Sequence, residues 1–237
     1  MRILALETSG MAGSVAVLEG ARLLAEKRLA PGERSAKHLA PAIAAALAEA
    51  GWAAAEVELV AVAVGPGSFT GLRVGVTTAK TLAYANRSSV LGVNTLEVIA
   101  WAVPPEHAQF HAVIDAQRAQ SFVAEFVRDS SGRPKAVADA RIVDDRELLA
   151  SLATGMVITG PGLTKLAATL PAGVIAVPEE LWSPMASAVG AIAHEDFQSG
   201  RRDDVFRLVP EYFRAAAAEE QWNRKSAAPS PSGRGQG

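Results

Sequence analysis

The sequence predicts an α/β protein that uses one folding unit twice, because the same order of strands and helices runs through both halves of the chain. Two Gly-Pro-Gly turns, at Gly65 and Gly160, support this repeat, since each follows an expected strand and precedes an expected helix. Each half reads strand, strand, strand, helix, strand, helix, which is the order of a ribonuclease-H-like unit. Similarity of residues between the halves is faint, so the prediction rests on element order and on these turns. We expect two ribonuclease-H-like lobes with mixed sheets.

The elements of the first half follow from short apolar or alternating runs separated by turn residues. Strands are expected at 3–6, 14–18, 22–29, 59–64 and 90–93, and helices at 35–50 and 71–86. Residues 59–64 form a continuous apolar run, which is typical of a central strand covered on both faces. Ser35 is positioned to cap the first helix.

The second half repeats the pattern with shorter elements. Strands are expected at 112–114, 121–127, 136–143 and 156–158, and a helix at 144–152. Ser183-Pro184 predicts the start of a last long helix, because proline is favoured at the first helical position. The expected organisation is a first lobe at 1–104 and a second at 105–224, with the last helix free to pack back on the first lobe. The Ser-, Pro- and Gly-rich segment 225–237 is expected to be disordered.

Composition limits the classes of function. Apolar residues make up 49% of the chain and charged residues 20%, which is an ordinary balance for a soluble globular protein. The net charge of −2 gives no strongly basic face, so if RNA is involved a partner is expected to hold most of it. The chain has no cysteine, which excludes disulfides and thiolate catalysis. Without a membrane span or a signal peptide, we expect a cytoplasmic location and no membrane partner.

The first Gly-Pro-Gly turn and the end of the first strand supply the candidates for a cofactor site. Glycines permit a tight turn, and free amides at a helix start can receive an anion. The turn has no Lys-Ser or Lys-Thr pair, so it is not a Walker loop, and a packing role is an equal alternative. The weak candidates for nucleotide binding are Glu7, Thr8, Ser9, Gly67 and Ser68. Hydrogen bonding within a hairpin would explain the hydroxyl groups equally well.

Small residues recur at a spacing of four on two helices. Gly71, Gly75 and Ala79 form one stripe, and an alanine stripe (36, 40, 44 and 48) lies beside an apolar row on the other helix. Each interior glycine costs roughly 1 kcal/mol relative to alanine, so close packing should offset it. One alternative is packing on the chain's own sheet, and the other is a helix-on-helix subunit interface. The candidates for partner binding are Leu39, Ile43, Leu47, Gly71, Leu72, Arg73, Gly75, Val76 and Ala79.

Four stretches in this order resemble the TsaB family. They read ILALETS from Ile3, AVAVGPGSFTGLRVG from Ala61, VLGVNTLEVIA from Val90 and AVIDAQRAQSFVAEF from Ala112, with a weaker echo in residues 210–214. The resemblance covers about residues 1–128, and GPGSFTGLRVG is its most specific part. It implies an actin-like ATPase (sugar kinase/heat-shock/actin) fold. The family more often has Asp at position 7, so Glu7 is assigned a structural or interface role before a catalytic one.

The resemblance also implies a function. A TsaB-type chain pairs with the catalytic subunit TsaD, with the ATPase TsaE joining through that heterodimer. Together they transfer threonylcarbamoyl to the N6 amine of the adenosine next to the anticodon, in transfer RNAs that read A-starting codons. Contact with transfer RNA would then be indirect, and the isolated chain would form a homodimer. No cofactor is expected on this chain alone, although ATP or ADP could bind where the two subunits meet.

Two positions separate this sequence from the catalytic relatives. TsaD carries a His-x-x-x-His metal pair where this chain has Thr95 and Ile99, and isoleucine cannot bind a metal. His107 and His111 are also four apart, but Pro104-Pro105 and the following strand argue against one shared helix face. We therefore expect no metal site and no catalytic residue. A metallopeptidase is an alternative that these missing ligands oppose.

An ATP-dependent small-molecule kinase or ATPase of the same superfamily is the main alternative function. It would need a carboxylate base, for which Glu7 and Asp115 are the candidates because each ends the first strand of its half. It would also need two complete phosphate loops, which the second Gly-Pro-Gly turn does not clearly supply.

Overall fold

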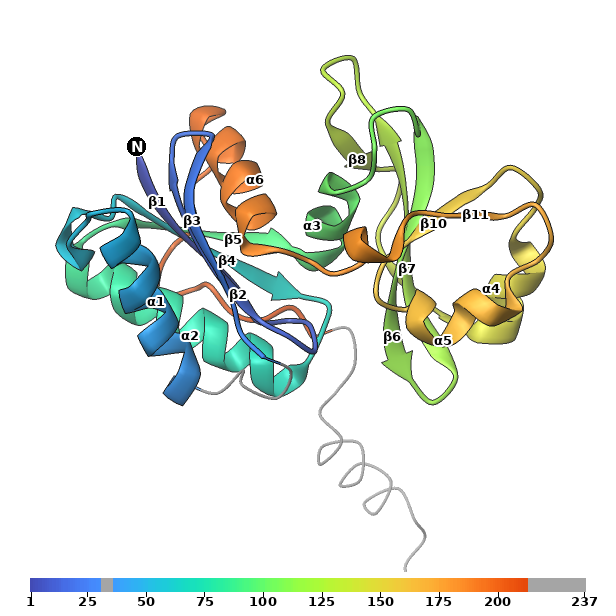
Figure 1. Cartoon of the computed structure of the whole chain (residues 1–237), viewed down its shortest axis with the longest axis horizontal. Helices are drawn as coiled ribbons and strands as arrows, with labels where there is room; N and C mark the ends of the chain where they lie inside the picture. Colours follow the sequence, from blue (N-terminus) through green and yellow to red (C-terminus); the bar gives the residue numbers. More distant parts are fainter. Residues whose placement is uncertain (31–35, 213–237) are drawn as a thin grey trace, which may run out of the picture.

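The computed structural model describes residues 1–30 and 36–212, and these form two lobes, each built on its own sheet (Figure 1). The first sheet has the order β3-β2-β1-β4-β5 and the second β11-β10-β6-β7-β8, with β9 also paired to β7. Both sheets join antiparallel strands on one side to parallel strands on the other. The architecture is the actin-like α/β fold with two ribonuclease-H-like lobes that the sequence predicts. Ser35 and residues 213–237, including the expected tail, lie outside the described residues.

The first lobe contains β1 (Arg2–Glu7), β2 (Ser14–Glu19), β3 (Arg22–Arg28), α1 (Ala36–Glu49), η1 (Ala54–Glu56), β4 (Leu59–Gly65), α2 (Phe69–Asn86), β5 (Ser89–Asn94) and α3 (Thr95–Trp101). Every residue of β4 is buried, as its continuous apolar run predicts. Helices α1 and α2 share one face of this sheet with a common core, and α3 and α6 lie on the other side (Figure 1).

The second lobe contains β6 (Gln109–Gln117), β7 (Gln120–Arg128), β8 (Pro134–Ala136), β9 (Arg141–Asp144), α4 (Asp145–Ser151), β10 (Val157–Thr159), α5 (Leu163–Leu166), η2 (Ala167–Thr169), β11 (Ile175–Ala176) and η3 (Glu179–Leu181). The single strand expected at 136–143 is wrong. Two short strands replace it, β8 against 126–128 and β9 against 120–123, both antiparallel to β7. Residues between them leave the ladder, so the alternating pattern spans an interrupted edge.

Helix α6 (Ala186–Gln198) belongs to the first lobe in space. Its buried face packs on β1, β2, β4 and β5 in one apolar core. Its first turn is held by that lobe too, because the Ala186 amide donates to Ser14 Oγ at 2.9 Å and the Ser187 amide to Glu26 Oε1 at 2.8 Å. The free amides of this helix start are therefore already hydrogen-bonded.

Residues 201–212 also return to the first lobe, and we call this segment the C-terminal strap. The Glu211 amide donates to Val64 O at 2.8 Å, and Lys80 Nζ donates to Leu208 O at 2.9 Å. The strap therefore lies along α2, on the lobe where the chain began. The expected division at 104/105 allowed the last helix to pack back on the first lobe, and α6 does so; the strap, which that division assigned to the second lobe, also contacts the first.

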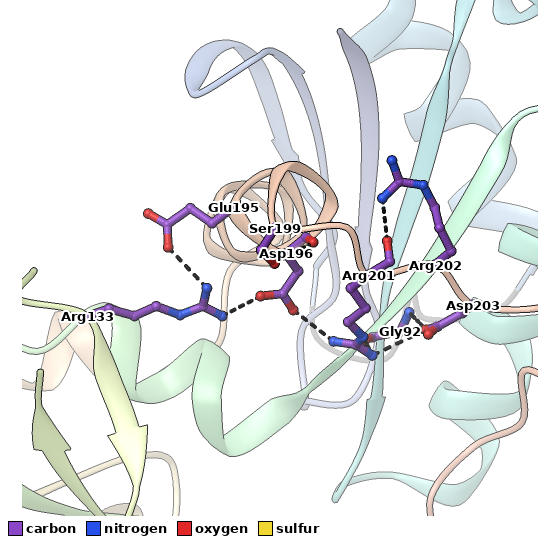
Figure 2. Close-up of polar contacts among 8 residues, drawn as sticks. All are labelled: Gly92, Arg133, Glu195, Asp196, Ser199, Arg201, Arg202 and Asp203. Carbon is purple, nitrogen blue, oxygen red and sulfur yellow. Dashed lines mark hydrogen bonds and ion pairs between the residues drawn. The ribbon is translucent and has the colours of Figure 1, made fainter.

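A network of charged side chains joins the second lobe to the end of α6 (Figure 2). Arg133, just before β8, donates to Asp196 Oδ1 at 2.6 Å and to Glu195 Oε2 at 3.2 Å. Arg201 Nη1 donates to the other oxygen of Asp196 at 2.8 Å, and its Nη2 donates to Gly92 O at 2.6 Å. One carboxylate thus links the second lobe to β5 through two guanidinium groups.

Ionisation within this network follows from burial and pairing. Burial opposes the charged form of Asp196 most strongly, but hydrogen bonds from Arg133 and Arg201 together outweigh it and hold the pKa of Asp196 below its ordinary value. Burial raises the pKa of the nearby Glu97, and the charge of Asp196 adds to that rise.

The helices of the described residues were also compared with the length and hydropathy of a membrane span, and none of them meets both requirements.

Candidate functional site

The five cofactor candidates come together in the first lobe, but they contact one another directly. The Ser68 amide donates to Ser9 O at 2.8 Å, and Thr8 Oγ1 donates to Gly71 O at 2.8 Å. A Cβ on Gly67 would lie 2.7 Å from both the Cβ and the backbone oxygen of Ser9. The two segments are therefore packed against each other, and several groups that could receive a phosphate are already hydrogen-bonded. In this structure they form a packing junction.

Glu7 ends β1 inside this junction, with its side chain fully buried. Its Oε1 accepts a hydrogen bond from the Ser9 amide at 2.7 Å and another from the Ser9 hydroxyl. The carboxylate thus fixes the turn after β1, which is the structural role that the sequence analysis prefers.

Asp115 holds the matching position at the end of β6 and is bound to a lysine. Lys165 Nζ lies 2.6 Å from Asp115 Oδ1 and 2.9 Å from Asp145 Oδ2, and Ser121 Oγ donates to Asp145 Oδ1 at 2.7 Å. Burial acts most strongly on Lys165 and favours its neutral form, but the two carboxylates outweigh burial and raise its pKa. The ammonium therefore stays charged and neutralises the candidate base. This cluster was not predicted from the sequence, although Lys165, three residues after the second Gly-Pro-Gly turn, was a visible signal.

The expected metal-ligand positions lie in or beside the apolar core. Thr95 and Ile99 are both buried in α3, and Thr95 Oγ1 has no hydrogen-bond partner among the described residues. His107 precedes β6 and His111 lies within it, so the two imidazoles do not share a helix. Across residues 1–30 and 36–212, no group of three or more His, Cys, Asp or Glu side chains could hold a metal ion.

Most of the expected partner-binding residues face inward. The buried members are Leu39, Ile43, Leu47, Gly71, Leu72, Gly75, Val76 and Ala79. A Cβ on Gly75 would lie 2.2 Å from Thr8 Oγ1, and one on Gly71 would lie 2.0 Å from Thr8 O. These residues pack on the chain's own sheet, which is the packing alternative that the sequence left open, and their contact with a partner stays a prediction. Arg73 is exposed, and its partner contact stays a prediction.

The side chains on the outer faces of the same two helices are small and exposed to solvent. Ala40, Ala44 and Ala48 line the outside of α1, and Thr77 and Thr81 lie on the outside of α2. The apolar row of α1 thus faces the core, and the neighbouring alanine stripe is exposed. The larger side chains enter the core because their burial removes more apolar surface from water.

The most specific sequence motif, GPGSFTGLRVG, and the weaker motif at 210–214 meet at the end of the strap. Arg73 Nε donates to the Tyr212 hydroxyl at 2.9 Å, and its guanidinium lies 3.9 Å from the ring centre of Phe69. The rings of Phe69 and Tyr212 are 4.7 Å apart. This cation–π and aromatic cluster fixes the strap to the first turns of α2. Phe213 and Arg214, the rest of the second motif, are outside the described residues.

Comparisons with known proteins find the TsaD family model, TsaB relatives and a solved YeaZ structure. A family model described as TsaD, tRNA N6-adenosine threonylcarbamoyltransferase, matches residues 30–191. The tRNA threonylcarbamoyladenosine biosynthesis protein TsaB of Escherichia coli K12 is 31% identical over 90% of this chain and 95% of its own length. TsaB of Bacillus subtilis is 27% identical over 94% of this chain and 98% of its own. The structure of YeaZ from Pseudomonas aeruginosa has the same fold, with a TM-score of 0.77 and 24% identity over 90% of this chain and 99% of that one.

Proposed function

Because the chain belongs to the TsaB family, we propose that it is a non-catalytic subunit that pairs with a TsaD-type transferase. The pair would modify the N6 amine of the adenosine next to the anticodon in transfer RNAs that read A-starting codons. The relatives that match along most of the chain are named for the biosynthesis of threonylcarbamoyladenosine in tRNA, which supports this process.

The observation that carries the non-catalytic role is that both candidate bases are engaged in their own lobes. Glu7 is fully buried and holds the turn at Ser9, and Asp115 is neutralised by Lys165. A general base must be able to reach the proton that it removes, which the fully buried Glu7 does not, while the exposed Asp115 is held in an ion pair. These contacts therefore support a subunit that contributes surface rather than bond chemistry.

The docking surface that we propose is the outside of α1 and α2, centred on Ala40, Ala44 and Ala48 of α1. Short side chains let a second helix approach closely. The distance between the axes of packed helices, about 8–10 Å, depends on the size of the side chains at their contact. The occupant would be a helical face of the TsaD partner. In its absence a second copy of this chain would cover the same surface, since exposed apolar surface favours association.

The remaining parts of the complex follow from this arrangement. TsaE would join through the heterodimer, and a partner would hold most of the transfer RNA because this chain has a net charge of −2. ATP or ADP would bind where the subunits meet rather than on this chain alone, since the junction of Ser9 with Ser68 is closed by its own hydrogen bonds. This chain would then act on TsaD through a coupling free energy between the two subunits.

Reconstitution tests the proposal. The chain would be combined with TsaD, TsaE and threonylcarbamoyl-adenylate synthase, and modified adenosine would be measured with and without Ala44→Arg. We expect Ala44→Arg to abolish both co-elution with TsaD and modification, because a long cation would block close helix approach. Ala168→Arg, at an exposed alanine of the second lobe, is the matched control and should change neither.

Three results would contradict the proposal. Unchanged co-elution of the Ala44→Arg chain would place the partner surface elsewhere. Modification of tRNA by the purified chain alone, or sustained ATP hydrolysis that Asp115→Asn abolishes, would make the chain an enzyme.

A further inference from the structure

A solvent-exposed hollow lies where the end of α2 meets the C-terminal strap. It has a volume of about 510 Å3 and is lined by Ala83, Tyr84, Ala85, Arg87, Ser88 and Val205. Ligand sites in proteins commonly have volumes of about 300–1,000 Å3, with mainly apolar walls and a few polar groups. Both the size and the composition of this hollow fit that description.

Two aromatic rings mark the hollow and its edge. Tyr84 is 68% exposed and Phe206, next to Val205 in the strap, is 74% exposed. Their centroids are 5.9 Å apart and their planes are 70° apart, so the two rings meet edge to face. Most of both rings therefore remains in water, where a flat partner could stack on them.

A cation stands on the wall beside these rings. Arg87 ends α2 in the left-handed conformation, with φ 56° and ψ 31°, a position that usually belongs to glycine. Its side chain is exposed and makes no hydrogen bond or ion pair with any residue in 1–30 or 36–212. Arg207, which follows Phe206, has a side chain that is 88% exposed, with Asp204 3.8 Å away. An arginine at a backbone position that favours glycine suggests that its side chain has a use.

Ser88 also lines the hollow, but its hydroxyl oxygen is shielded from solvent and has no hydrogen-bond partner among the described residues. A ligand in the hollow would not reach that oxygen. The hollow therefore offers stacking surface and positive charge.

We infer that this hollow binds a nucleoside phosphate, presented by an unpaired stretch of RNA. The base would stack on the exposed face of Tyr84, with Phe206 beside that ring, and Arg87 would bind the phosphate. Aromatic side chains interleaved with cations are how proteins hold single-stranded nucleic acid. An apolar peptide would use the rings but would leave the cation unpaired. The inference goes beyond the proposed function, since it requires neither TsaD nor catalysis.

Binding by the full chain tests this inference. Fluorescence anisotropy would follow a labelled, unstructured single-stranded RNA oligonucleotide, with AMP as a competitor. Tyr84→Ala should weaken RNA binding about tenfold or more, the usual effect of losing one stacking ring. Arg87→Gly should weaken it too, while the melting temperature stays the same or rises because glycine accepts a positive φ. Arg146→Ala removes an exposed cation from the second lobe and should have little effect.

The outcomes separate the possible ligands. RNA binding that both hollow variants weaken, without competition from AMP, supports the site with RNA as its source. Tight binding of AMP with the same sensitivity supports the nucleoside phosphate site and makes the free nucleotide its ligand. No RNA or AMP binding, or equal loss in Arg146→Ala, would overturn the inference. Loss of TsaD co-elution in Tyr84→Ala without RNA binding would also overturn it and make the hollow a protein contact.

Discussion

The glycine stripe of α2 gives the sharpest test of how this fold is held together. An exposed glycine within a helix is normally improved by alanine, by roughly 1 kcal/mol. At Gly75 the new methyl group would lie 2.2 Å from Thr8 Oγ1, which is well inside van der Waals contact. Thr8 is fully buried and its hydroxyl is hydrogen-bonded to Gly71 O, so it has little freedom to move.

The expected magnitude follows from these opposing effects. Extra volume in a packed core costs about 1–3 kcal/mol, and loss of the Thr8 hydrogen bond would add about 1 kcal/mol. After subtracting the helix-propensity gain, we expect Gly75→Ala to destabilise the protein by about 1–3 kcal/mol. For a chain of this size that lowers the melting temperature by several degrees.

Urea and thermal unfolding, followed by circular dichroism, would measure the effect. Thr77→Ala, on the exposed side of the same helix, is the matched control and should stay within about 0.5 kcal/mol of the parent. In a Thr8→Ala background the obstruction is gone, so Gly75→Ala should become neutral or stabilising. A parent chain made more stable by Gly75→Ala would refute the close packing of α2 on β1. A residue larger than alanine at Gly75 would disturb the packing against Thr8, so its effect would report on folding and not on partner binding.

Three further predictions concern the contact between the lobes, the charge of Glu97 and the dimerisation of the isolated chain. Arg133→Ala should lower the unfolding free energy by about 1–3 kcal/mol, since Arg133 and Asp196 are both mostly buried, and urea unfolding would measure it; an unchanged midpoint would mean that the lobes do not depend on this contact. Glu97→Gln should raise the melting temperature at pH 7, because the raised pKa of Glu97 marks a carboxylate whose charge opposes folding. The gain should shrink as pH falls from the raised pKa to below about 4.3, where the acid is protonated in both states, and a gain that persisted at lower pH would exclude this cause. Sedimentation of the isolated chain should show a dimer that Ala44→Arg dissociates, and a monomer at high concentration would contradict the second-copy occupant.

The sequence was most informative where burial is signalled locally. The apolar run at 59–64 predicts a strand covered on both faces, and β4 is buried throughout. The turns at Gly65 and Gly160 fall at strand ends as expected, because glycine is needed where the backbone has a positive φ. The family could also be indicated from the sequence alone, because the motif GPGSFTGLRVG is specific enough without the structure.

Patterns on one helix showed which residues share a face, but not which face enters the core. Both α1 and α2 carry stripes that fit either a partner or a sheet. On α1 the leucine row turns inward and the alanines outward. On α2 the glycines turn inward because Thr8 occupies the space beside them. That choice depends on a residue more than 60 positions away, so periodicity alone could not predict it.

The sequence by itself determined the two-lobed α/β class, most strands and helices, and the family, because these depend on local propensity, burial pattern and motif identity. Only the tertiary structure decided that α6 and the strap return to the first lobe, that Lys165 pairs with Asp115, and that Tyr84 and Arg87 line a hollow beside the strap. Each of these depends on contacts between segments distant in the chain. Such contacts form through packing and charge pairing in three dimensions, and no short window of sequence contains them.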